Sequence, residues 1–374
     1  MDYSRLFDPL VISGKLTLKN RLVMAPMTTA SGEADGRFSS AEITYLEERA
    51  QNGIGLIMTP ACYCHKSGHS FDHQVGCHTD DMLTRLEMCA EAINRHGAAS
   101  FLQIHHGGNA AKEQYAGQPP IAPSAVLNRL GASEMPREMT EAEIEMIIAA
   151  FASASGRAKR AGFTGIELHG ANTYLFQQFF SCFTNKRTDK WGCGSAADEE
   201  HSLDNRCRFA EEVVKAVRSE VGSAYPISYR ISPEEADPDG YNAYDAIELL
   251  RRLVPLGIDI VHVSGRQYGT SLRNDYPPGM HPVSLIRQAM PETVAVIGVG
   301  GVRHPDHAIA VLDDGVDLVA LGKILLLDAE WAAKVRNGDI GRIRMSIETK
   351  EQLRQLNIPG PMQTYSERHF FPAS

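Results

Sequence analysis

Three side chains that can donate hydrogen bonds, His169, Asn172 and Tyr174, lie within six positions of one another in the segment HGANTY. His169 and Asn172 are three residues apart, and in a turn or first helical turn that spacing puts both side chains on one side. Two converging donors suit one acceptor oxygen and stabilise charge that develops on it. The phenol of Tyr174 is protonated at neutral pH and can deliver a proton. The same residues also fit a polar loop with a buried histidine, a turn asparagine and a rim aromatic side chain.

Eight short apolar segments are available to position these side chains, and His169 lies at the end of the fourth. They are rich in Val, Ile and Leu and bounded by Gly, Pro or polar residues, as strands covered on both faces are. Their ranges are 21–27, 53–61, 99–106, 163–170, 226–232, 257–265, 293–301 and 316–322. Helical patterns follow at 39–53, 140–162, 204–222, 242–257 and 304–315. Eight successive strand-then-helix units predict a (β/α)8 TIM barrel, and a doubly wound sheet is the alternative.

The chain of 374 residues suits one large barrel domain over residues 1–374. We expect the barrel core at about 20–330 and a C-terminal extension at about 331–374. Segment 107–139 is expected to be a long loop after the third strand, and long loops in compact domains often serve function.

Composition excludes several classes of protein. The net charge is −9, hydrophobic residues make up 43% and charged residues 22%, as in globular proteins. No block of Lys and Arg is present, so a nucleic acid partner is not expected. No apolar run reaches the ~20 residues that cross a bilayer, and no secretory leader begins the sequence, so a cytoplasmic location is expected. The seven cysteines include no C-x-x-C pair, which predicts reduced thiols without a disulfide framework.

The ends of the last two strands carry residues typical of a phosphate site. In TIM barrels the active site lies at the C-terminal ends of the strands. Gly300 and Gly301 end the seventh strand, and Gly322 and Lys323 end the eighth. Glycine turns there expose backbone N–H groups, and the lysine adds a positive charge. Glycines that only make tight turns are the alternative.

Gln103 on the third strand and Arg230 on the fifth point to a planar ligand. The guanidinium group is always charged and planar, and with an amide it can address the polar edge of a heterocycle. A structural arginine paired with a carboxylate of the barrel is the alternative. Together with the phosphate site, the two residues indicate FMN, with its ring over the mouth of the barrel.

Several motifs occur together and in order. DPLVISGKLTLKNRLVMAPMT, LQIHHGGNAA, HGANTYLFQQFFSCFTNKRTDKWG, LDNRCRFAEEV and GVDLVALGK resemble the Old Yellow Enzyme family of FMN-dependent oxidoreductases over about residues 5–330. The chain closely resembles the bacterial single-domain ene-reductase branch. The dienoyl-CoA reductase branch, with its cysteine-rich iron–sulfur segment and second nucleotide domain, is not expected, because the sequence matches neither its cysteine spacing nor its length.

The resemblance assigns roles by position. His169 and Asn172 would hold the carbonyl or nitro oxygen of an activated alkene, and Tyr174 would protonate Cα after hydride from flavin N5 reaches Cβ. Arg230 would stabilise negative charge at the N1 side of the reduced flavin. The remaining cofactor-binding residues would be Ala25, Pro26, Met27, Thr28, Ala61, Gln103, Ser264, Gly300, Gly301, Gly322 and Lys323. The family usually has Arg at the last position, and Lys323 keeps the charge but loses the bidentate fork.

The function that the resemblance implies is an FMN-dependent NAD(P)H ene-reductase. Its substrates would be enones, enals, maleimides or nitroalkenes, and no separate dinucleotide motif chooses between NADH and NADPH. A flavin-dependent demethylase or a reductase of quinones or nitro-esters is a related alternative. A metal-dependent barrel hydrolase and a non-catalytic flavin redox sensor are alternatives of other classes.

Two further segments carry open questions. Segment 64–78 holds His65, His69, His73 and His78 with two cysteines, and either a substrate-facing loop or a metal site fits it. We expect the loop and no bound metal. In the tail, the resemblance implies that Arg368 reaches the active site of a neighbouring subunit, which would make the protein a homo-oligomer, a dimer or a tetramer. A flexible tail is the alternative.

Overall fold

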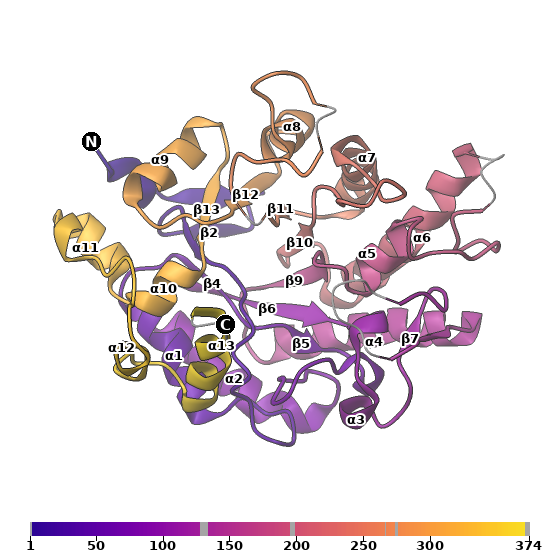
Figure 1. The fold of residues 1–374 in the computed structure, drawn as a ribbon, viewed down its shortest axis with the longest axis horizontal. Coiled ribbons are helices and arrows are strands. Elements are labelled where there is room, and N and C mark those ends of the chain that lie inside the picture. The colour runs from indigo at the N-terminus through magenta and orange to yellow at the C-terminus, as the bar shows by residue number, and fades with distance from the viewer. Residues whose placement is uncertain (1, 128–133, 195–198, 266, 274–275, 371–374) are drawn as a thin grey trace.

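The computed structural model describes residues 2–127, 134–194, 199–265, 267–273 and 276–370, and at 199–201 and 368–370 only the backbone. Eight parallel strands close into a barrel (Figure 1). They are β3 (Leu22–Met24), β4 (Leu56–Met58), β6 (Ala99–His105), β9 (Gly165–Gly170), β10 (Ile227–Ile231), β11 (Ile260–Val263), β12 (Ala295–Val299) and β13 (Leu318–Leu321). β3 pairs with both β13 and β4, and β4 pairs with β6, which completes the ring. The predicted (β/α)8 barrel is confirmed, and each predicted strand segment contains one barrel strand.

The outer ring of helices contains the five predicted ones. They are α1 (Ser40–Gln51), α4 (Glu141–Arg160), α6 (Glu199–Val221), α7 (Ala243–Leu253) and α9 (Pro305–Asp313). Thr140 and Glu143 form a capping box at the start of α4, which satisfies two backbone N–H groups there. Two further helices, α2 (Leu83–Asn94) and α8 (Pro282–Ala289), were not predicted, and α6 begins before residue 204. Short helices such as α8 offer too few turns for a clear apolar period.

A hairpin near the N-terminus closes one end of the barrel. Strands β1 (Leu10–Ile12) and β2 (Leu16–Leu18) pair antiparallel. Ile12 and Leu18 are buried in an apolar cluster with Leu56, Phe101 and Ile297 of the barrel strands. The opposite end, where the strands finish, is therefore the open one.

Segment 107–139 was expected to be a loop, but it contains regular structure. The short helices η4 (Gly108–Ala110) and α3 (Glu113–Ala116) come first, and β7 (Ile121–Ala122) then pairs with β8 (Arg137–Glu138). Elements of two to four residues are too short to show a helical or strand period in the sequence.

Further short elements complete the described chain. They are η1 (Ser4–Phe7), β5 (Cys62–Tyr63), η2 (Lys66–Gly68), η3 (Asp80–Met82), α5 (Leu175–Phe180), η5 (Val254–Leu256), α10 (Lys323–Leu327), α11 (Trp331–Asn337), η6 (Ile340–Arg342), α12 (Lys350–Arg354) and α13 (Gly360–Phe370). β5 extends the sheet beside β6. Within the described part of the chain, no helix combines the length and apolar character that crossing a membrane requires.

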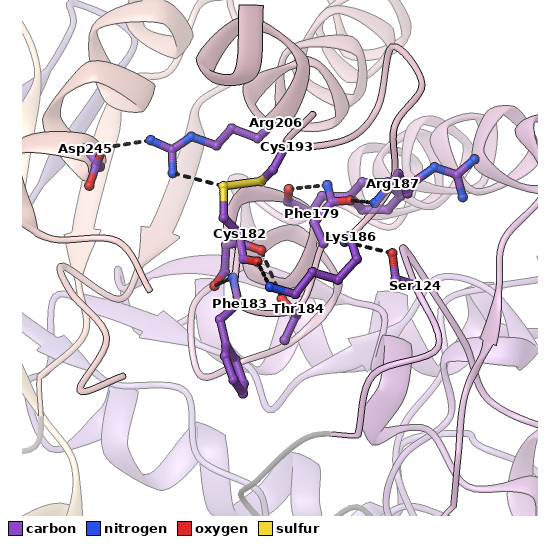
Figure 2. The surroundings of a disulfide bond; sticks show 12 residues. Ser124, Phe179, Cys182, Phe183, Thr184, Lys186, Arg187, Cys193, Arg206 and Asp245 are labelled. Atoms are coloured by element: carbon purple, nitrogen blue, oxygen red, sulfur yellow. Dashed lines mark hydrogen bonds and ion pairs between the residues drawn. A yellow bond between two sulfur atoms is a disulfide. The ribbon is translucent and has the colours of Figure 1, made fainter. Parts of the chain in front are cut away.

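The expectation that all cysteines are reduced thiols is wrong for one pair. Cys182 and Cys193 form a disulfide with their Cα atoms 5.6 Å apart (Figure 2). The loop after α5 brings them together because Asn185 Nδ2 donates to the carbonyl oxygens of Phe179 and Trp191. Arg187 pairs with Asp189 and braces the same loop. The two cysteines are eleven positions apart in the sequence, so they do not form a C-x-x-C motif.

Candidate active site

A buried carboxylate organises the strand ends at the open side of the barrel. Glu167 on β9 accepts hydrogen bonds from Gln103 Nε2 at 2.8 Å, from Ser228 Oγ at 2.9 Å and from His262 Nδ1 at 2.8 Å. The parallel register pairs Glu167 with Gln103 on one side and with Ser228 on the other, which explains why these side chains meet. All four residues are buried.

A second chain of hydrogen bonds leads from the barrel to the rim. Arg230 Nη2 donates to Ser264 Oγ at 3.0 Å, and Ser264 Oγ donates to Asn172 Oδ1 at 3.3 Å. Because Asn172 uses its oxygen as an acceptor, its amide nitrogen is left to donate outward. Arg230 is buried, and its Nε has no hydrogen-bond partner.

The turn after β9 has a backbone that the sequence pattern did not predict. Asn172 and Thr173 both adopt left-handed conformations, with φ of 59° and 64°. Helix α5 begins only at Leu175, with Tyr174 as its N-cap residue. His169 and Asn172 therefore lie on a tight turn and not on a helical turn. Such strained turns often occur at functional sites.

Tyr174 is enclosed by aromatic rings. Its ring lies edge-on to His105 with centroids 4.3 Å apart, at 5.0 Å from His169 and at 6.1 Å from Phe71. No hydrogen bond among the described residues ends on its hydroxyl group, which leaves that group available to a ligand.

Burial sets the protonation states in this group. It lowers the pKa of His105 to about 3, assisted by the charge of His69. It also lowers the pKa of His169 well below its usual value, with Arg230 adding to the effect. Burial, then the charge of Tyr365, raises the pKa of Tyr174. Both histidines are therefore neutral and the phenol is protonated at neutral pH.

The C-terminal helix α13 reaches the same rim (Figure 1). Tyr365 makes a side-chain hydrogen bond with Thr28, just beyond β3, and its phenol adds to the raised pKa of Tyr174. A narrow cleft nearby is lined by Thr28, Ala61 and Phe71 among others. Tyr365 of α13 thus lies at the mouth of its own barrel.

The turns after β12 and β13 are adjacent because these strands pair in register. Gly300 and Gly301 have φ of 147° and 64°, and a Cβ on Gly300 would come within 2.4 Å of the backbone nitrogen of Tyr268. Lys323 is exposed, and none of the ion pairs within the described residues involves it. A Cβ added to Gly322 would lie 3.7 Å from Met27 Sδ. The segment after β3 therefore contributes to the same end of the barrel.

The predicted residues gather at this end of the barrel. Ala25 and Pro26 are buried after β3, with the Ala25 N–H donating to Leu321 O at 2.9 Å, and Ala61 follows β4. Helix α13 contains Arg368, but its side chain lies outside the described residues. The prediction of a contact with a neighbouring subunit therefore stays a prediction.

The histidines of segment 64–78 are engaged with protein groups. His65 Nδ1 lies 2.7 Å from Ser67 Oγ, which lies 2.9 Å from His106 Nε2, and His69 stacks on Tyr63 at 4.5 Å. Within the described residues, no three or more His, Cys, Asp or Glu side chains are arranged to hold a metal ion. His106 uses both ring nitrogens in hydrogen bonds, whereas its neighbour His105 faces Tyr174.

Glu167, His262 and Tyr365 were not predicted as site residues, and no role was predicted for His105. A signal existed for the first two. A carboxylate and an imidazole within otherwise apolar parallel strands, IELHG and DIVHV, need partners when buried. Tyr365 had no local signal, because only the path of the C-terminal extension brings it to the rim.

These groups fit a flavin mononucleotide. Buried nitrogens of Arg230, His169 and His262 lack hydrogen-bond partners within the described residues, and buried polar atoms are ordinarily satisfied. The glycine turns and Lys323 offer donors and a charge for a phosphate. Both halves of such a ligand thus find matching groups at one end of the barrel.

Comparisons with known proteins agree. The model of the NADH:flavin oxidoreductase / NADH oxidase family matches residues 5–340. An NADH:fumarate oxidoreductase of Klebsiella pneumoniae (strain 342) is 37% identical over 97% of this chain, which spans 39% of that protein. The "Probable NADH-dependent flavin oxidoreductase YqiG" of Bacillus subtilis (strain 168) is 33% identical over 96% of this chain and 95% of its own length. The solved complex of 2-naphthoyl-CoA reductase with 2-naphthoyl-CoA has a TM-score of 0.83 and 28% identity, covering 92% of this chain and 54% of that one.

Proposed function

The chain belongs to the NADH:flavin oxidoreductase / NADH oxidase family, and on that premise we propose that it reduces activated C=C bonds. Its substrates are enones, enals, maleimides or nitroalkenes, its cofactor is FMN, and its electron donor is NADH or NADPH. The single observation that carries the proposal is the set of groups around Tyr174, His169 and Asn172 at the open end of the barrel.

The substrate oxygen is held by His169 and Asn172. Asn172 Oδ1 is occupied by Ser264, so Nδ2 donates to the ligand. His169 is neutral because burial lowers its pKa, so it contributes one N–H donor without a full charge. Two such donors stabilise negative charge as it develops on the carbonyl or nitro oxygen, and removing one from a comparable site costs roughly 3–4 kcal/mol.

FMN, when bound, would supply the redox chemistry, namely hydride transfer from the nicotinamide to Cβ of the alkene. Tyr174 then donates its phenolic proton to Cα. Its raised pKa keeps the proton on the oxygen until the substrate becomes basic, and the rings of His105 and His169 hold the phenol in place. The net change is addition of H2 to the alkene, with NAD(P)H oxidised.

The remaining residues bind the cofactor. Gly300, Gly301, Gly322 and Lys323 hold its phosphate, and Gln103 and Arg230 hold the polar edge of its ring. Ala25, Pro26, Met27, Thr28, Ala61 and Ser264 line the space around that ring. Arg230 provides the positive charge that favours an anionic reduced flavin.

The relative named for fumarate reduction supports a C=C bond as the target, since fumarate carries one. This chain spans 39% of the length of that relative, so the substrate of the relative cannot be assigned to this chain. A carboxylate-activated alkene therefore belongs in the substrate panel.

The test uses anaerobic stopped-flow spectroscopy of the purified protein. We expect a yellow protein that NADH or NADPH bleaches, and whose colour returns on mixing with cyclohexenone, maleimide or a nitroalkene. A phenolic ligand should produce a long-wavelength charge-transfer band. A protein that retains no flavin, or a reduced flavin that only oxygen reoxidises, would overturn the proposal.

A further inference from the structure

Glu167 is a completely buried carboxyl group for which the proposed reaction has no direct use. Its Oε1 accepts from Gln103 Nε2, and its Oε2 accepts from Ser228 Oγ and His262 Nδ1, all within 2.9 Å. Three hydrogen bonds from three different strands converge on this one side chain. A buried ion needs such compensation.

The carboxylate is ionised. Burial by itself raises the pKa of Glu167, but the charges of His262 and Arg230 and the hydrogen bonds from His262 and Gln103 outweigh it and lower the pKa. An ionised carboxylate only accepts hydrogen bonds. His262 therefore carries a proton on Nδ1, and Gln103 turns its amide nitrogen toward Glu167.

This constraint decides what Gln103 offers a ligand. The opposite orientation of its amide would bring two acceptor oxygens together in the buried centre of the barrel, which is costly. With Nε2 engaged by Glu167, no hydrogen bond among the described residues ends on Gln103 Oε1. Arg230, by contrast, has only donors to offer. The site thus presents an acceptor from β6 and donors from β10.

We propose that Glu167 is a positioning residue that fixes Gln103 with its carbonyl oxygen toward the cofactor, where it accepts the N3–H of the isoalloxazine. The pyrimidine edge of that ring alternates C=O, N–H and C=O, so it requires an acceptor flanked by donors, and Arg230 supplies a donor. This inference rests on the proposed function, because it takes FMN as the ligand.

The test compares the affinity of the apoprotein for FMN and for 3-methyl-FMN, which lacks the N3–H. We expect the wild-type protein to prefer FMN by about 10-fold or more, since an unsatisfied buried acceptor costs at least one hydrogen bond. In Glu167→Gln the amide of Gln103 is no longer held in one orientation. The ratio of the affinities for FMN and for 3-methyl-FMN should therefore fall toward one. The midpoint potential of bound FMN becomes more positive, because a buried negative charge is lost where reduction adds one.

Ser228→Ala is the matched control. It removes a different hydrogen bond from the same carboxylate, but leaves the charge and the contact with Gln103. We expect it to keep both the preference for FMN and the potential. A merely structural role for Glu167 would weaken the binding of both flavins equally and leave their ratio unchanged.

Several outcomes overturn the inference. One is equal affinity of the wild-type protein for both flavins, and another is a Glu167→Gln variant with the wild-type ratio and potential. If Glu167→Gln does not fold, Glu167→Asp replaces it. That variant keeps the charge on a shorter side chain, so it should keep the potential and lose part of the preference, and an unchanged preference overturns the inference. Failure of the wild-type protein to bind FMN at all would instead refute the proposed function.

Discussion

The ring of Tyr174 meets the ring of His105 edge-on, with centroids 4.3 Å apart and planes 85° apart. His105 ends β6, whereas Tyr174 follows the turn after β9. Two neighbouring strands therefore fix the position of the phenol. Edge-on contacts of aromatic rings are favourable in themselves. They also leave the hydroxyl group free to act on a substrate.

Replacing Tyr174 by Phe should separate the two half-reactions. Flavin reduction by NAD(P)H needs no proton from this residue and should change little. Alkene reduction should slow by about 10²- to 10⁴-fold, the usual contribution of a general acid. Anaerobic stopped-flow measurement of each half-reaction checks this. Tyr365→Phe is the control with another phenol at the rim, and equal slowing by both variants would contradict the assignment.

The buried histidines should make stability depend on pH. Burial lowers the pKa of His105 to about 3, whereas an unfolded chain titrates near 6.5. Between these values the unfolded state binds more protons than the folded state, so stability falls as pH drops through this window. Thermal unfolding midpoints at pH 7.5 to 5 should therefore decrease toward low pH.

His105→Phe should make that decrease shallower without removing it, because burial also lowers the pKa of His169 and His106. His307, on the surface, supplies the control variant His307→Phe, which should keep the wild-type slope. An unchanged slope in His105→Phe would count against a neutral buried imidazole.

Lys323→Ala should weaken binding of FMN but not of riboflavin, which has no phosphate. A charge-assisted hydrogen bond contributes about 1.5–3 kcal/mol, so the affinity for FMN should fall about 10- to 100-fold. Fluorescence titration of the apoprotein measures both ligands. Lys112→Ala, at another exposed lysine, should change neither. If riboflavin loses as much affinity as FMN, Lys323 does not bind the phosphate.

The disulfide predicts the number of reactive thiols. Five cysteines are free and all five are buried, so the native protein should react slowly with a thiol reagent. Denaturation without reduction should expose five thiols, and reduction should expose all seven. Seven reactive thiols in the denatured but unreduced protein would exclude the disulfide between Cys182 and Cys193. Replacing both Cys182 and Cys193 by Ser should lower the free energy of unfolding by about 3 kcal/mol in the chain-entropy model.

Mixing subunits decides whether Arg368 acts on its own barrel or on a neighbour. Tyr174→Phe and Arg368→Ala should each have low alkene reductase activity. If Arg368 serves a neighbouring subunit, co-expressed mixed oligomers contain some sites with both intact residues and regain activity. A protein in which Arg368 serves its own barrel regains none, and a monomer in sedimentation analysis would exclude the arrangement outright.

The sequence alone determined the barrel and much of its open end. Eight apolar segments with turn signals require a repeated strand-then-helix unit, and closure follows from that repetition. His169, Gln103 and Arg230 could be placed at one end because parallel strands in a barrel all finish there. These inferences use only information local to each segment.

Tertiary structure decided how those residues are oriented. The partners of Glu167 lie 61 to 95 residues away along the chain, and their pairing depends on strand register, which no local pattern encodes. The same holds for Tyr365 at the rim and for the loop that joins Cys182 to Cys193. Local composition specifies which elements form, whereas the hydrogen bonds that orient the side chains arise only when distant strands pack together.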